Sequence, residues 1–201
     1  MEAGRRERKK QLTRQALVTA AIRLFDERGY DRTTVAEIAE AADVSKRTFF
    51  LHFPTKEDVL LADAEVRTGL ALRAIEDRGP ASSVRDVLAA AADSMIANVS
   101  ATELPSGLAE LRAELVVTNP AVQARMLHVL FSAQTRLADA LHRAYPDLLD
   151  ATSAAATVGA LMGAINAAAI TSLGLDQTPR ETRQAMQRAA EVALRATDSR
   201  P

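Results

Sequence analysis

The chain has 201 residues, a formal net charge of −1 and no cysteine. The lack of cysteine excludes disulfides, thiolate metal sites and cysteine nucleophiles, and it fits a cytoplasmic location. Only 3% of the residues are aromatic, and 8 Gly and 7 Pro leave few turns, so a β-rich fold is disfavoured. The composition predicts an all-α protein with long helices.

The charges are unevenly distributed along the chain. Up to Lys56 there are 12 basic and 8 acidic residues, a net charge of +4, whereas the remainder carries −5. A basic segment in front of an acidic body indicates a polyanion-binding region at the N-terminus. The net charge of the whole chain conceals this asymmetry.

The first three predicted helices are short and closely spaced. A basic, mobile arm over residues 1–10 is expected to precede a helix from about Arg8 to Arg28, which Gly29 ends. Thr34 and Glu37 have the spacing of a capping box and start a second helix. Ser45 is expected to cap a third helix over residues 46–53.

The same capping signals divide the rest of the chain into about six more helices, with no credible strand. Thr55 and Asp58 predict a fourth helix that continues through Leu70. Ser83 with Asp86 starts a helix expected over residues 84–99, and Asn119 before Pro120 starts one expected over residues 120–145. The others are expected over residues 108–117, 148–173 and 179–196.

Residues 35–53 have the layout of a helix-turn-helix, whose second helix enters the major groove of DNA. Its first residues would be Ser45, Lys46, Arg47 and Thr48, which are able to hydrogen-bond base edges or phosphates. Lys56 follows at a position suited to another phosphate. The alternative is a basic surface helix without a ligand.

Residues 8–61 resemble the N-terminal domain of TetR/AcrR-type transcriptional regulators. The resemblance rests on Phe25, the Gly29-Tyr30 and Thr33-Thr34-Val35 runs, and Val44-Ser45 through His52-Phe53. It implies a DNA-binding domain over residues 1–56 and a helical ligand-binding and dimerisation domain over residues 57–201. It further implies a homodimeric regulator, most often a repressor, that binds a palindromic operator and is released by a small molecule. No cofactor other than this unidentified effector is expected.

The resemblance also assigns roles to single residues. Thr34 and Ser45 would contact phosphate, Lys46, Arg47 and Thr48 would read bases, and His52 and Lys56 would contact the backbone. Phe50 stands where the family usually has Tyr and so lacks a phosphate-binding hydroxyl, and Arg47 and Asp43 replace frequent glycines. Arg47-Thr48-Phe49-Phe50 with Phe53-Pro54 also resembles the subgroup associated with acyl-CoA-like ligands.

The segment from Ala151 to Leu175 contains no charged residue and is long enough to span a bilayer. Its small, weakly apolar residues and its acidic flanks favour a soluble packing helix instead. By the resemblance, the last two helices of each subunit form the dimer interface; packing inside the chain is the alternative. The predicted interface residues are Ala160, Gly163, Ala167, Ile170, Met186, Ala189, Ala190, Ala193 and Leu194.

A ligand pocket is expected among the middle helices, although apolar residues at helical spacing are by default plain core. Arg112 and Asn166 would be its polar anchors, unless Arg112 pairs with a surface Glu. The other candidates are Met95, Val99, Leu108, Leu111, Leu115, Met126, Leu130, Phe131 and Met162.

No catalytic or metal-binding motif accompanies the three histidines, so neither an enzyme nor a metal site is predicted. Two competing functions remain open at this point. One is a helical small-molecule-binding or scaffold protein without a DNA role, and the other is a helical enzyme.

Overall fold

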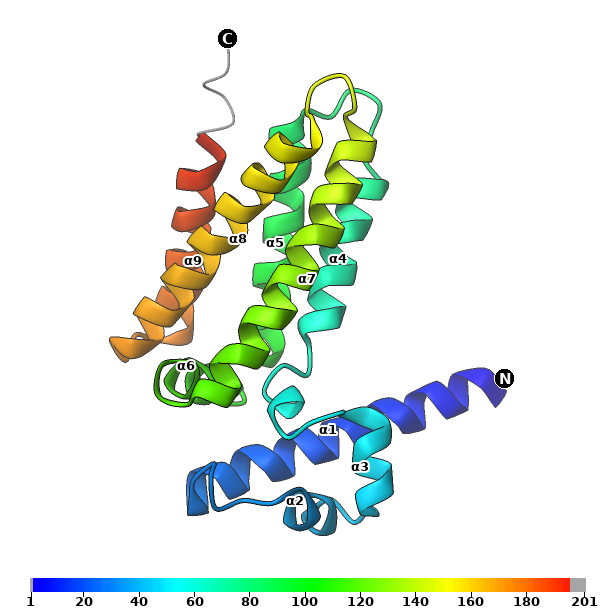
Figure 1. The fold of residues 1–201 in the computed structure, drawn as a ribbon, viewed down its shortest axis with the longest axis vertical. Helices are drawn as coiled ribbons and strands as arrows, with labels where there is room; N and C mark the ends of the chain where they lie inside the picture. The colour runs from blue at the N-terminus through cyan, green and yellow to red at the C-terminus, as the bar shows by residue number, and fades with distance from the viewer. Residues whose placement is uncertain (1, 196–201) are drawn as a thin grey trace.

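The computed structural model describes residues 2–195, and within them all regular structure is helical (Figure 1). The head, defined as α1–α3, lies across one end of the body, defined as α4–α9 (Figure 1). The elements are α1 Glu2–Arg28, α2 Val35–Ala41, α3 Lys46–His52, the 3-10 helix η1 Glu57–Val59, α4 Ala64–Glu76, α5 Val84–Thr102, α6 Leu108–Thr118, α7 Pro120–Ala144, α8 Ala151–Gly174 and α9 Pro179–Arg195. These nine α-helices confirm the predicted fold class, and Ala196, the predicted last residue of the final helix, lies outside the described residues.

The first helix starts earlier than the sequence predicted. It begins at Glu2 instead of about Arg8, so residues 2–10 are helical and not a mobile arm. The segment is rich in Arg, Lys and Glu, which favour helix, but it has no apolar face to reveal the helix as a periodic pattern. The N-terminal part of α1 extends beyond the rest of the head in Figure 1.

The head has its own apolar core. Its centre is formed by buried residues of the three head helices, Leu17, Phe25, Ile38 and Phe49, and by Phe53, which follows α3. Leu108, Leu115 and Val122, from α6 and α7, belong to the same cluster. The head core is thus continuous with the near end of the body, and the division after Lys56 stays a prediction.

The predicted fourth helix is interrupted. The backbone amide and the hydroxyl of Thr55 both donate to Asp58 Oδ2 at 2.9 Å, as a capping pair should, but the helix stops after η1 and α4 begins only at Ala64. The carbonyls released by this interruption accept bonds from elsewhere: Leu60 O from Arg112, and Ala62 O from Arg14. Side chains distant in the sequence thus hold the junction between head and body.

The body is a bundle in which α4 packs against α5 and α7, and α8 packs against α7 and α9. Residues from all of these helices meet in one core, including Ile75, Leu88, Leu141, Val158 and Met186. Leu149 is buried in this core and Asp150 caps α8, so that helix begins at Ala151 instead of about Leu148.

By length and composition alone, α8 could cross a membrane. An 18-residue stretch of this helix has a mean hydropathy of 1.5, and only 28% of that stretch is buried. A single helix of this kind is weak evidence for a membrane span. Alanine, glycine and threonine supply most of its exposed residues, as expected for a helix that packs closely on another helix.

Candidate nucleic-acid interface

The buried side of α3 fixes its position on the head. Phe49 and Phe53 lie in the core with their rings 5.7 Å apart, and the guanidinium of Arg14 lies 4.2 Å from the Phe53 ring centre. Arg14 also donates to the carbonyl oxygen of His52 at 3.0 Å. The helix is therefore held by its core face and its C-terminal end, which leaves the opposite face open.

The turn before α3 is tight. Asp43 adopts a φ of 53°, and its amide donates to Glu40 O at 3.0 Å, while the amide of Val44 donates to Ala39 O at 2.9 Å. Asp is among the residues that tolerate this left-handed conformation best after Gly. The replacement of a usual glycine by Asp43 is accommodated as predicted.

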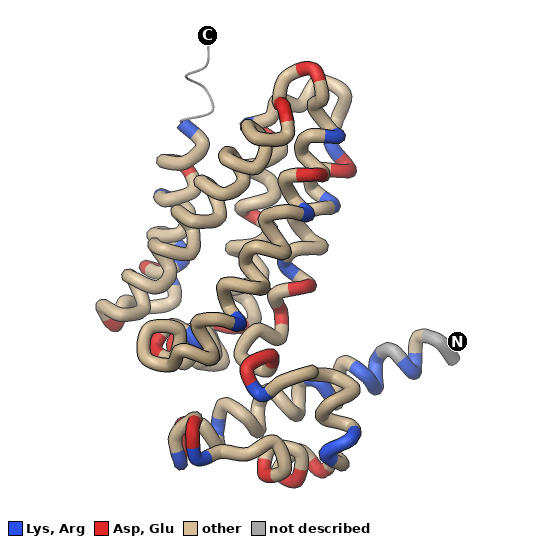
Figure 2. Tube along the Cα trace, in the orientation of Figure 1, with Lys and Arg blue, Asp and Glu red and all other residues tan. Residues whose placement is uncertain are grey.

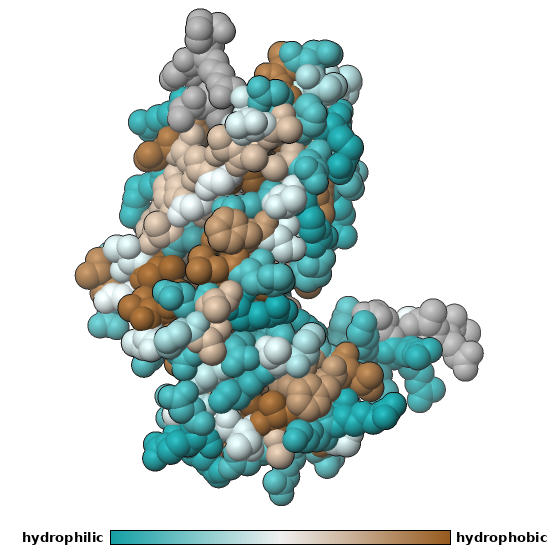
Figure 3. Space-filling view, in the orientation of Figure 1, coloured by the Kyte–Doolittle hydropathy of each residue, from teal (hydrophilic) through white to brown (hydrophobic). Residues whose placement is uncertain are grey.

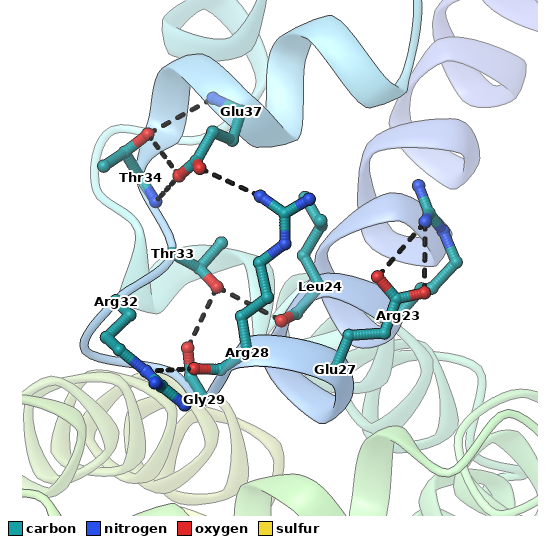
Figure 4. A network of polar contacts seen from close by, with 9 residues as sticks. All are labelled: Arg23, Leu24, Glu27, Arg28, Gly29, Arg32, Thr33, Thr34 and Glu37. Carbon is teal, nitrogen blue, oxygen red and sulfur yellow. Dashed lines mark hydrogen bonds and ion pairs between the residues drawn. The ribbon is translucent and has the colours of Figure 1, made fainter.

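A network of polar contacts fixes α2 against the end of α1 (Figure 4). The Thr33 hydroxyl lies 3.2 Å from Leu24 O and 2.9 Å from Gly29 O, and Gly29 ends α1 with a φ of 83°. Arg28 reaches across to Glu37 at 3.1 Å. The two helices of the helix-turn-helix are thereby positioned relative to α1.

The predicted capping box at Thr34 is confirmed, and it occupies the Thr34 side chain. The Glu37 amide donates to Thr34 Oγ1 at 3.3 Å, and Glu37 Oε2 accepts from the Thr34 amide at 2.8 Å. These hydrogen bonds lower the pKa of Glu37, so it remains ionised. Thr34 is exposed beside α2, where the predicted phosphate contact remains a proposal.

The four residues at the start of α3 that are expected to contact phosphate or bases fall into two groups. Ser45 accepts from the Thr48 amide at 3.0 Å, and the two hydroxyl oxygens lie 2.8 Å apart, so Ser45 and Thr48 mainly build the helix start. Lys46 and Arg47 are exposed, and within residues 2–195 neither has an ion pair or a side-chain hydrogen bond. These two cations are fully open to a ligand, and the DNA contacts predicted for all four residues stay predictions.

Lys56 has partners inside the head. Its ammonium donates to Tyr30 O at 2.8 Å and to Thr33 O at 3.1 Å, and it lies 3.9 Å from the Tyr30 ring centre. Two of the three N–H donors of the ammonium therefore brace the loop between α1 and α2, and the contact of Lys56 with a phosphate stays a prediction.

His52 is half-buried, and its Nδ1 is buried without a hydrogen-bond partner. Burial, followed by the nearby positive charges of Arg14 and Lys10, lowers the pKa of His52. A neutral imidazole offers no charge to DNA at neutral pH, so the predicted backbone contact would be a hydrogen bond only.

Positive charge gathers on one side of the head. Figure 2 shows blue segments along the N-terminal part of α1 and on α3. The α1 cations Arg5, Arg6, Arg8, Lys9 and Lys10 are all exposed. A row of cations beside an exposed basic helix suits the phosphates that flank a major groove.

The comparisons with known proteins agree with this geometry. The family model described as "Bacterial regulatory proteins, tetR family" matches residues 17–62, which contain the helix-turn-helix. This segment of the chain belongs to the TetR family. The head is therefore similar to the DNA-binding helix-turn-helix domain of that family, and the curated relatives that the segment matches are transcriptional regulators.

Individual relatives extend the comparison. The HTH-type transcriptional regulator TcmR of Streptomyces glaucescens is 38% identical over 101 residues, which are 50% of this chain and 45% of TcmR. The chain thus spans less than half the length of this curated relative.

Two solved structures share the fold over almost the whole chain. FadR of Thermus thermophilus, a TetR-family repressor in complex with lauroyl-CoA, gives a TM-score of 0.59 at 23% identity, covering 94% of this chain and 96% of FadR. FadR of Bacillus subtilis in complex with stearoyl-CoA gives 0.60 at 20% identity, covering 90% and 97%.

In the body the predicted pocket residues do not meet in one cavity. Met95 and Met162 line a cavity of about 20 Å³ in the body core, and Arg112, Met126 and Asn166 line another of about 30 Å³. Both are far smaller than a site for a drug-sized ligand.

The other pocket candidates lie elsewhere. Phe131 is 63% exposed, so its predicted place in the pocket is wrong. Leu108 and Leu115 belong to the head core, and Val99 and Leu130 pack on the body core.

Leu111 lines a larger open groove of about 990 Å³. The groove lies between α1, α6 and the end of α8, and includes Ile22, Glu110, Glu114 and Leu173. Sequence reasoning missed it because no local pattern indicates that these three elements converge.

The residues predicted for the dimer interface fall into buried, exposed and half-buried groups. Met186, Ala190 and Leu194 are 1%, 5% and 2% exposed, because α9 turns this face toward α5 and α8; their assignment to a subunit interface is corrected to the core. On α8, Ala160, Gly163 and Ala167 are exposed and remain available to a partner. The half-buried members of the predicted set are Ile170, Ala189 and Ala193.

A buried ion cluster connects the body to the head. Glu103 at the end of α5 is fully buried, pairs with Arg67, and lies 2.6 Å from Arg112 Nη2. Burial raises the pKa of Glu103, but the guanidinium groups of Arg112 and Arg67 lower it by more, so Glu103 stays ionised. Arg112 also donates at 3.3 Å to the carbonyl oxygen of Leu60, whose side chain belongs to the head core, so one guanidinium connects both parts of the molecule.

Two further contacts cross the same junction. Arg125 of α7 pairs with Asp58 at 2.7 Å, and Asn119 donates to Asp31 at 3.2 Å. The predicted pairing of Arg112 with a neighbouring surface Glu is therefore incorrect, since its partner is the buried Glu103.

Proposed function

We propose that this protein is a cytoplasmic repressor that binds a palindromic operator as a homodimer and leaves it when a small molecule binds the body. The observation that carries the proposal is α3: it is anchored by Phe49 and Phe53, and it leaves Lys46 and Arg47 exposed at its start. Long cations at this position of a helix-turn-helix can donate to guanine O6 and N7.

Dimerisation through α8 is the second part of the proposal. The exposed Ala160, Gly163 and Ala167 lie three or four residues apart, on one side of the helix, where small side chains permit close approach of a second helix. Leu127 and Phe131 of the adjacent α7 are 46% and 63% exposed and would supply apolar area at the edge of this surface. A twofold dimer presents two copies of α3 to two half-sites about one DNA turn apart, roughly 34–36 Å.

Ligand release is the third part, and the acyl-CoA complexes of the two FadR structures support an acyl-CoA-like effector. The small cavity beside Arg112 and Asn166 would have to enlarge to admit it. Because Arg112 also holds Leu60 O, an anionic group that draws Arg112 into the cavity would loosen the head. Release then follows from a changed spacing of the two α3 helices.

Selection of duplexes from a random pool tests DNA binding. We expect enrichment of a palindrome, with an affinity that falls steeply as salt rises. Equal binding to selected and random duplex at moderate salt would instead favour a helical ligand-binding or scaffold protein without a DNA role. Adding lauroyl-CoA to the selected complex tests release, and unchanged binding at saturating ligand would reject this class of effector.

Gly163→Leu tests the dimer. A Cβ at Gly163 meets no atom within 4 Å, so the larger side chain leaves the fold of the single chain intact while blocking a closely packed partner. Gly69→Ala on α4, which also meets nothing within 4 Å, is the control. Sedimentation should show a monomer for the first variant and a dimer for the second.

A further inference from the structure

The open face of α3 carries an apolar patch beside its cations. Phe50 is 47% exposed and Leu51 is 73% exposed, although large apolar side chains are usually withdrawn from water. Figure 3 shows brown atoms gathered over this part of the head and surrounded by hydrophilic residues. The helix that the family presents to DNA therefore offers two side chains that cannot form a hydrogen bond.

The aromatic part of the patch is held in place by the core of the head. The Phe50 ring packs edge-on against the buried Phe49, with the ring centres 5.5 Å apart and the planes at 83°. Phe49 in turn packs on Phe53 in the core. Because Phe50 and Leu51 follow Arg47 by three and four residues, all three side chains lie on one side of the helix.

Base chemistry identifies what such a patch can recognise. The major groove presents hydrogen-bonding atoms on every base pair, and the one apolar group among them is the C5-methyl of thymine. A leucine and a phenyl ring gain free energy from covering a methyl and gain nothing from covering a carbonyl or an amino group. Lys46 and Arg47 bring the same surface to a polyanion, which favours DNA over an apolar protein as its occupant.

We infer that Phe50 and Leu51 read the methyl groups of thymines next to the base contacted by Arg47. This inference rests on the proposed DNA-binding function. In this role, Phe50 and Leu51 determine the sequence specificity of each half-site. A phenyl ring at position 50, without the usual hydroxyl, then has a function of its own. Each half-site should contain at least one thymine whose replacement by uracil weakens binding.

Uracil substitution is the sharpest test, because it removes the methyl and leaves every hydrogen-bonding group in place. On the selected palindrome, each contacted thymine changed to uracil should weaken binding by about fourfold, the equivalent of roughly 0.8 kcal/mol for one buried methyl-sized group. In Leu51→Ala, at least one of these uracil effects should disappear, while binding remains specific for the palindrome.

Leu148→Ala is the matched control, since Leu148 is 69% exposed at the far end of the body. It should retain every uracil effect. If no thymine in the half-site responds to uracil, or if Leu51→Ala and Phe50→Ala keep the full response, the inference is overturned while specific binding still supports the proposed function. If no duplex is enriched at all, the proposed function itself fails.

Discussion

Neutralising Glu103 should destabilise the folded protein strongly. The carboxylate is fully buried between Arg67 and Arg112, whose side chains are only 12% and 13% exposed. Glu103→Gln keeps the shape but leaves two guanidinium groups facing each other with no anion between them. Loss of one partner from a buried ion pair costs about 3–5 kcal/mol.

That cost is a large share of a typical unfolding free energy of about 5–15 kcal/mol. In a protein of this size each kcal/mol lowers the melting temperature by about 2–4 °C, so a drop of roughly 6–20 °C is expected. Urea denaturation followed by circular dichroism measures the free energy directly.

Glu65→Gln is the control for this experiment. Glu65 pairs with Arg136 on the surface and is 75% exposed, so its loss should change stability by less than about 1 kcal/mol. A loss of under 1 kcal/mol in Glu103→Gln as well would refute the account of the cluster. Replacing all three buried residues by apolar ones should recover most of the stability, because the desolvation cost of the charges is then removed as well.

Three further predictions follow from the head and the helix caps. Lys56→Met should cost about 1.5–3 kcal/mol of stability by removing two charge-assisted bonds, with no change in the salt slope of DNA binding. Deleting residues 2–10 should weaken DNA binding and flatten its salt dependence without changing the preferred site, as competition titrations would measure. Hydrogen bonds from the N-cap residues lower the pKa of Glu37, Asp86 and Glu181, so the melting temperature should hold above about pH 5 and fall below about pH 4.

For each of these three predictions, one result would contradict the reasoning. A reduced salt slope in Lys56→Met would identify Lys56 as a phosphate contact. A changed preferred site after the deletion would mean that the N-terminal helix reads a groove. A melting temperature that stays constant down to pH 3 would show that the capping carboxylates add nothing to stability.

Local signals predicted most of the fold. Thr34 with Glu37, Ser83 with Asp86 and Asn119 before Pro120 fixed three helix starts, because a capping box needs only residues within one turn. The start of α1 escaped prediction because residues 2–10 have helix-favouring composition without an apolar stripe.

The site was predictable only in part, for a related reason. Exposure of Lys46 and Arg47 follows from their position after a capping Ser45, which is local. The contacts of Lys56 with Tyr30 and Thr33, of Arg112 with Leu60 and of Asp58 with Arg125 join residues 23 to 67 positions apart, and no spacing rule brings them together. The face that α9 buries was likewise undetermined, because small and apolar residues suit a subunit interface and a core equally well.

The base-specific effect of Arg47→Ala tests the central claim most directly. With the selected palindrome and all single base-pair variants of it, the wild-type protein should discriminate at the position read by Arg47, and the variant should lose about 1–3 kcal/mol there and little elsewhere. An equal loss at every position and on random duplex would contradict the account, because Arg47 would then contact only the phosphate backbone.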